Sequence, residues 1–156
     1  MSNQIPFPRW TPETVGERGT TICNVMVGDR VVTIGYLVSR HLRVLDLEGR
    51  IVSRDATGYG GIRTVPSARR QGYLATWYQS AAFLTPPQDV KMLFCLEALV
   101  RRNRELGWTI LDCVVTYDQP TGRSRMPPHV YAAIIDPLDR INPATLAAVQ
   151  IQGYPW

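Results

Sequence analysis

One segment of the sequence combines charged side chains and glycine in a way that suits the binding of an anion. It runs from Ile62 to Leu74, and it places Arg69, Arg70 and Gly72 between an apolar stretch and a stretch with helical spacing. This pattern predicts a strand that enters a turn and a turn that opens a helix. The first turn of a helix has free N–H groups and the positive end of the helix dipole. A glycine lets a phosphate approach the backbone closely, and arginine adds charge-assisted hydrogen bonds. We therefore expect the turn to bind a phosphate or pyrophosphate group.

Residue patterns of other common active sites are not found in the sequence. It has no Gly-x-Ser-x-Gly nucleophile motif and no P-loop motif. The three cysteines, Cys23, Cys95 and Cys113, lie in separate apolar stretches, and the only histidines are His41 and His129. This spacing does not match a zinc site. We expect the cysteines to be small core residues in a reducing compartment.

The residues around the anion-binding turn predict a sheet with antiparallel and parallel strands. Apolar stretches bounded by turn signals predict strands at residues 21–27, 31–38, 41–47, 50–54, 57–65, 90–96, 108–117 and 130–135. Helical spacing predicts one helix that begins with Ser67 as its cap and ends before Pro86, and a short basic helix at residues 98–106. The strands on either side of the first helix need a crossover, so we expect them to be parallel. The expected fold class is α/β with a mixed sheet.

Length and composition are those of one globular domain. The chain has 156 residues, of which 45% are hydrophobic and 19% charged, which suffices for a core without a disulfide or metal. We expect a single domain at residues 20–156, preceded by an extended arm at residues 1–19. No apolar stretch approaches the ~20 residues that span a membrane, and the N-terminus lacks a secretory signal pattern. These observations favour a cytoplasmic protein without a membrane partner.

Positive charge is in modest excess and is carried almost entirely by arginine. Lys and Arg number 17 against 13 for Asp and Glu, and Lys91 is the only lysine. Arginine binds phosphate in a bidentate manner, so the excess permits an anionic partner. We interpret Arg101, Arg102 and Arg104 on the basic helix as a solvated face. Binding of an adenosine 3′-phosphate or of nucleic acid is the alternative for these three.

The anion-binding turn and its surroundings resemble the GNAT superfamily of acyl-CoA-dependent N-acyltransferases. The family's mark is a strand followed by [Arg/Gln]-x-x-Gly-x-[Gly/Ala] at the start of a helix, and residues 69–74 fit it except at Leu74. Residues 105–108, Glu-Leu-Gly-Trp, resemble the end of the family's last helix. Residues 153–156, Gly-Tyr-Pro-Trp, resemble the C-terminus of a subset near the aminoglycoside two-prime N-acetyltransferases and nodulation-type N-acyltransferases. The resemblance covers residues 20–156 and implies a GNAT-like fold, with a shortened N-terminus that lacks the usual first strand and helices.

This resemblance implies acetyl-CoA, or coenzyme A, as the cofactor. The motif strand would bind the pantetheine arm through its backbone, and the Gly60–Gly61 pair is compatible with a bulge there. The turn would bind the pyrophosphate. The residues assigned to the cofactor are Ile62, Arg63, Thr64, Val65, Arg69, Arg70, Gln71, Gly72, Tyr73 and Leu74.

Two positions depart from the family's catalytic pattern. Gly60 stands where the aminoglycoside-type subset has a Glu, and Asn103 stands where many members have a Tyr. Acyl transfer to an amine needs a proton acceptor, and the leaving thiolate can take a proton from a weak acid. The candidate bases are Asp55, Glu97 and the terminal carboxylate of Trp156, which the resemblance places near the acceptor site, and the candidate acid is Tyr117.

Taken together, these residues predict an N-acetyltransferase that acts on a small primary amine by direct attack on the thioester. The alternative is a catalytically inactive GNAT-fold protein that serves in interaction or regulation, with or without coenzyme A. A nucleic-acid-binding module ranks last, because no aromatic platform lies between the basic residues. The short N-terminus leaves a sheet edge or the acceptor pocket open, which makes a homodimer our expectation for the assembly.

Overall fold

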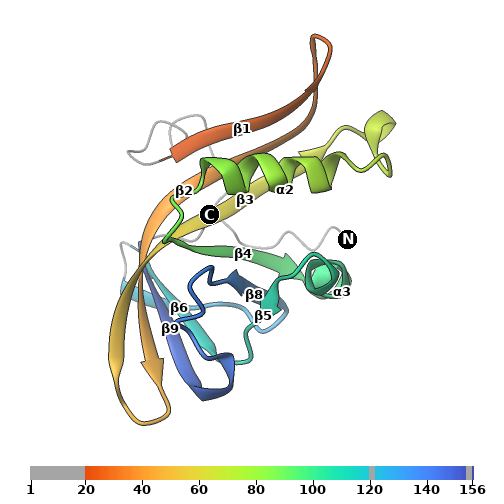
Figure 1. Ribbon diagram of the computed structural model, residues 1–156. Coiled ribbons are helices and arrows are strands. Elements are labelled where there is room, and N and C mark those ends of the chain that lie inside the picture. The colour runs from red at the N-terminus through yellow and green to blue at the C-terminus, as the bar shows by residue number, and fades with distance from the viewer. Residues whose placement is uncertain (1–19, 120–121, 154–155) are drawn as a thin grey trace.

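The computed structural model describes residues 20–119, 122–153 and 156. Within them, nine strands form one mixed sheet and two α-helices pack beside it (Figure 1). The expected α/β class with a mixed sheet is therefore confirmed. The arm predicted at residues 1–19 lies outside the described residues. No helix in the described part is long and apolar enough to cross a membrane.

The elements follow one another along the chain with short connections. In order they are β1 (Thr20–Val27), β2 (Arg30–Asp46), β3 (Ile51–Thr64), the 3-10 turn η1 (Pro66–Ala68), α2 (Tyr73–Leu84), β4 (Val90–Leu96), α3 (Glu97–Glu105), β5 (Thr109–Ile110), β6 (Val114–Gln119), β7 (Gly122–Arg125), β8 (Val130–Ile135), the 3-10 turn η2 (Pro143–Thr145) and β9 (Leu146–Gln152).

β2 and β3 are each one long strand, which corrects the sequence prediction. The separate strands predicted at residues 31–38 and 41–47 form β2, and those at residues 50–54 and 57–65 form β3. Ser39 and Arg40 look like a break in the sequence, but their backbone pairs without interruption with Thr57 and Ala56. Whether a strand continues depends on its pairing with neighbouring strands, and the local pattern of hydrophobic residues does not predict this pairing.

β2 is long enough to belong to two parts of the sheet. Its first half pairs with β1 and its second half with β9, while β3 lies along its other edge. The strand order is β5-β8-β4-β3-β2-β9-β6-β7. In Figure 1, α2 lies over β1, β2 and β3, and β2, β3, β9 and β6 curl below it. The sheet therefore has an upper part covered by α2 and a curled lower part.

Each part has its own core. In the upper part, Trp77 of α2 is fully buried and its indole N–H donates to the carbonyl of Cys23 at 2.9 Å. A Cβ built on Gly35 would lie 2.3 Å from that indole, so the glycine makes room for the ring. The lower core consists of apolar residues, mostly from β2, β4, β6, β8 and β9 and from the connecting segments, together with Trp156.

The parallel pair predicted around the first helix is present as β3 and β4, joined by α2. The helix begins after Gly72 rather than at a Ser67 cap, because Pro66–Ala68 forms a separate 3-10 turn. The strand predicted at residues 108–117 is interrupted at residues 111–113, which splits it into β5 and β6. β7 and β9 were not predicted.

Candidate functional site

β3 and β4 separate partway along their length and leave a cleft between them. They pair only from Ala56–Val90 to Tyr59–Leu93. Beyond this point β3 stays on β2 and β4 stays on β8. The cleft has a volume of about 320 Å³. Since residues 60–64 have no strand partner on the β4 side, this edge of the backbone is open to a ligand.

A bulge in β3 accompanies the separation, as the Gly60–Gly61 pair predicted. The register between β2 and β3 shifts between Ile34 and Tyr36. Gly61 has a φ of +61°, and a Cβ there would lie 2.5 Å from the ring of Tyr36. A side chain at this position is therefore excluded both by backbone conformation and by contact.

The Arg-rich turn forms a second hollow at the end of β3. Its volume is about 400 Å³, and it is lined by Ile62, Arg63, Thr64, Ala68, Arg69, Arg70, Gly72, Tyr73, Leu74 and Arg102. Gly72 has a φ of +82°, and α2 begins here without a side-chain cap. A Cβ on Gly72 would have no atom within 4 Å. The helix N-terminus therefore faces open space lined by arginines.

Eight of the ten residues assigned to the cofactor line this hollow. Val65 does not: its N–H donates to the carbonyl of Val32 at 2.9 Å and its side chain packs on the upper core. Gln71 does not either, because its amide donates to the carbonyl of Ser67 at 3.1 Å. Arg69 donates to the carbonyl of Thr64 at 3.2 Å, which ties the turn to the end of β3.

The hollow and the cleft adjoin, because both are lined by Ile62, Arg63, Leu74 and Arg102. Arg102 lies on α3, where the sequence analysis predicted that Arg101, Arg102 and Arg104 form a solvated face. Neither Arg70 nor Arg102 forms an ion pair with a described acidic residue. The two spaces form one channel with cations at the turn and open backbone along β3.

A tyrosine and an asparagine meet inside the cleft. The hydroxyl of Tyr78 on α2 donates to Oδ1 of Asn103 on α3 at 3.4 Å, and both residues line the cleft. Burial raises the pKa of Tyr78 to about 12, so its hydroxyl stays protonated at neutral pH. Tyr78 is partly buried and packs against the upper core. Its helical spacing could reveal only that it faces the sheet, not that the sheet is open there.

Cys95 lies beside this pair but is not arranged as a nucleophile. It is 7% exposed. Burial raises the pKa of its thiol, and a hydrogen bond with Asn103 lowers it by less. A thiol with a raised pKa is unreactive as a nucleophile, which agrees with the interpretation of Cys95 as a buried strand residue.

Trp156 lies at the point where the pairing of β3 and β4 ends. Its indole N–H donates to the carbonyl of Tyr59 at 3.0 Å, and its ring centroid is 5.1 Å from that of Phe94. A Cβ on Gly58 would lie 2.2 Å from the indole, and one on Gly60 would lie 2.8 Å from it. Gly58 and Gly60 together thus give Trp156 its space. The sequence analysis considered Gly60 as a departure from a family Glu and as part of a bulge, and it did not predict this contact.

The four catalytic candidates do not form one cluster. Asp55 is exposed and bonds Nδ1 of His41 at 2.6 Å. Strand alternation puts it on the opposite face of β3 from Gly58 and Gly60. Glu97 is exposed as the first residue of α3.

The other two candidates belong to the lower core: Trp156 is one of its buried members, and Tyr117 is partly buried against it. The roles of Asp55, Glu97, Tyr117 and the Trp156 carboxylate stay predictions. Among the described residues, no group of three His, Cys, Asp or Glu side chains could hold a metal ion.

No protein-family model matches the chain, and no curated protein matches it. The geometry of the channel is therefore the basis for a functional proposal.

Proposed function

We propose that the protein is an acyl-CoA-dependent N-acyltransferase with a GNAT-like arrangement, and that it acylates a small primary amine by direct attack on the thioester. The observation that carries this proposal is the channel that joins the Arg-rich turn to the cleft between β3 and β4. Coenzyme A has the same order of groups: phosphates at one end, an amide-rich arm, and a thiol at the other end.

The residues of the channel fit this ligand in chemical terms. Arg70, Arg102 and the N-terminus of α2 would hold the phosphates. The open backbone edge of residues 60–64 would hold the amides of the arm. A bulky group on Gly72 would occupy the space where a phosphate approaches. When bound, acyl-CoA supplies the thioester.

Tyr78 is the hydrogen-bond donor that we propose for the leaving thiolate. Its hydroxyl comes from α2 and donates to Oδ1 of Asn103 at 3.4 Å. Asn103 stands at the position where many family members carry a tyrosine on the last helix. A phenol with a pKa of about 12 keeps its proton at neutral pH, so its hydroxyl would donate a hydrogen bond to the thiolate, which is the weaker base and leaves without taking the proton. The tyrosine would thus be supplied by a neighbouring helix.

Thermal unfolding with acetyl-CoA, with inorganic phosphate as the control ligand, tests the proposal. A ligand at about 100 times its Kd raises the free energy of unfolding by about 2.7 kcal/mol. For a domain of this size, this raises Tm by roughly 5–10 °C. Gly72→Glu should abolish the rise.

Gly28→Glu is the matched control, because Gly28 also has a positive φ, +59°, and also has no atom within 4 Å of a built Cβ. A chain whose Tm does not respond to acetyl-CoA would end the proposal.

A second candidate is a protein that binds coenzyme A without turning it over. The observation that favours it is the scatter of the catalytic candidates, with Asp55 and Trp156 at opposite faces of β3. Thiol release from acetyl-CoA in the presence of a panel of amines separates the two. Binding without thiol release for every amine supports the non-catalytic protein.

A further inference from the structure

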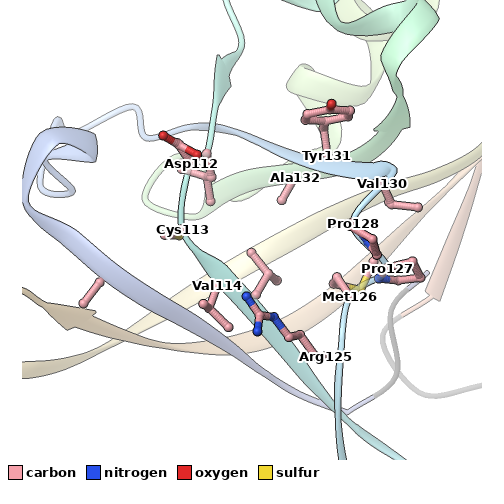
Figure 2. A pocket seen from close by; sticks show the side chains of 13 residues that line it. Asp112, Cys113, Val114, Arg125, Met126, Pro127, Pro128, Val130, Tyr131 and Ala132 are labelled. Atoms are coloured by element: carbon pink, nitrogen blue, oxygen red, sulfur yellow. The ribbon is translucent and has the colours of Figure 1, made fainter.

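The sheet has a second and larger opening, between the β5–β8 pair and the β6–β7 hairpin. On the β5–β8 side, the last backbone hydrogen bond before the opening runs from the N–H of Leu111 to the carbonyl of Ala132 at 2.8 Å. On the other side the N–H of Met126 donates to the carbonyl of Val115 at 2.9 Å. Residues 111–113 and 126–129, which connect these strands, lie outside the sheet ladder. The cavity between them has a volume of about 850 Å³ (Figure 2).

Apolar side chains form one wall of this cavity, and polar groups form much of the rest of its surface. Five of its lining residues are buried members of the lower core: Leu111, Val115, Met126, Val130 and Ala132. Pro127 and Pro128 form part of the rim and offer no backbone N–H. The volume lies within the ~300–1,000 Å³ typical of small-molecule sites, which are lined mainly by apolar groups with a few placed polar ones. The apolar wall would cover one side of an apolar ligand body.

One cation is directed into the opening. In Figure 2 the guanidinium of Arg125 points between β6 and the segment that follows β7, beside Val114. The carboxylate of Asp112 points away from the other labelled side chains. The guanidinium of Arg125 forms no hydrogen bond or ion pair with a described residue, whereas that of Arg123 on the same strand pairs with Asp118 at 2.8 Å. Arg125 is therefore available for an anionic group of a ligand.

We propose that this cavity binds an organic anion with an apolar body, such as an aromatic or aliphatic carboxylate, with the carboxylate on Arg125. The binding proposal stands without the proposed function. If that function holds, one source of the ligand is the acceptor or its acylated product. Ala132 in the cavity wall pairs directly with Phe94, and Phe94 lines the cleft. The other source is a carboxylate that is not a substrate.

Titration calorimetry on the full chain with N-acetyl-L-phenylalanine tests the binding. The neutral amide of the same compound is the control ligand. We expect the acid to bind at least about tenfold more tightly than the amide, because a charged partner strengthens the hydrogen bonds of the guanidinium. Arg125→Gln should remove this difference, and Arg123→Gln should preserve it.

A second pair of variants tests the place of the apolar body. Ala147 lines the cavity and its neighbour Ala148 does not. Ala147→Phe should abolish binding of the acid, and Ala148→Phe should leave it intact. Equal binding of acid and amide, binding that survives both Arg125→Gln and Ala147→Phe, or no binding at millimolar acid would each overturn the proposal.

The source of the ligand is decided by mass spectrometry after incubation with L-phenylalanine and acetyl-CoA. An N-acetylated product identifies the cavity as the acceptor site. Binding of the acid without any acetylation of the amine identifies a site for a separate carboxylate. Failure of the acyltransferase proposal would appear instead as a missing Tm response to acetyl-CoA, so the two outcomes are distinguishable.

Discussion

The cleft between β3 and β4 and the cavity beside β6 are both gaps in one sheet, but they are opened by different residues. At the cleft, a glycine bulge and the indole of Trp156 end the pairing and leave backbone exposed. At the cavity, two connections without strand pairing separate the strand pairs and leave a hollow walled on one side by apolar side chains. The first gap therefore suits a ligand rich in amides and phosphates, and the second suits an apolar body with one charge. Changing one gap should leave the other intact.

Trp156→Ala should have the largest effect and should affect the cleft. The indole is 8% exposed, and its loss leaves a cavity against Phe94 and Gly58. We expect the free energy of unfolding to fall by about 3–5 kcal/mol in urea titrations. Phe83→Ala is the control, since Phe83 is 90% exposed and its truncation should change stability by less than about 0.5 kcal/mol. A small effect of Trp156→Ala would show that the indole is not a packed part of the cleft.

Alkaline pH should destabilise the cleft through its tyrosines. Burial raises the pKa of both Tyr59 and Tyr78 to about 12, against about 10 in the unfolded chain. The unfolded state therefore loses protons first, and stability that is complete below pH 10 is lost as pH rises towards 12. The buried thiols, whose pKa values are also raised, act in the same direction from about pH 9.

The measurement is urea unfolding at pH 8 and pH 11.5 for the wild type and Tyr78→Phe. Over this range the free energy of unfolding of the variant should fall by about 2 kcal/mol less than that of the wild type. Equal losses for the two proteins would show that Tyr78 is not buried in its neutral form.

Gly58→Ala should destabilise the protein by about 1–3 kcal/mol, because the added methyl overlaps the Trp156 indole. The sharper measurement is a double-mutant cycle. In a Trp156→Ala background the space is free, so Gly58→Ala should have little effect there. Additive effects of the two substitutions would mean that the indole does not rest on Gly58.

Asp55→Asn should have the smallest effect. The carboxylate is exposed, and its partner among the described residues is the exposed His41, so the pair should contribute less than about 0.5 kcal/mol. Since Asp55 faces away from Gly58 and Gly60, we also expect thiol release to be unchanged. A loss of turnover at unchanged stability would restore Asp55 as a candidate base.

The two gaps also differ in how far the sequence could predict them. The turn at residues 69–74, the helix after it and the strand at Val90–Leu96 are local patterns, and the structure contains all three. The contact of Trp156 with Gly58 and Gly60 joins distant segments, so no local spacing reports it. The meeting of Tyr78 with Asn103 depends on where two helices pack. Local patterns could also not show that residues 108–117 are interrupted, because the interruption is set by pairing with β8 and β9.

The double pairing of β2 has a consequence for folding. β1 and β3, the partners of its upper half, are close to it along the chain, whereas β9 is the last of the nine described strands to be synthesised. Until residues 146–152 leave the ribosome, one edge of residues 41–46 has no partner and β6 has no parallel neighbour. Contacts of such long sequence separation form slowly. The upper part with α2 can therefore form early, while the nascent lower part presents an open strand edge to other chains.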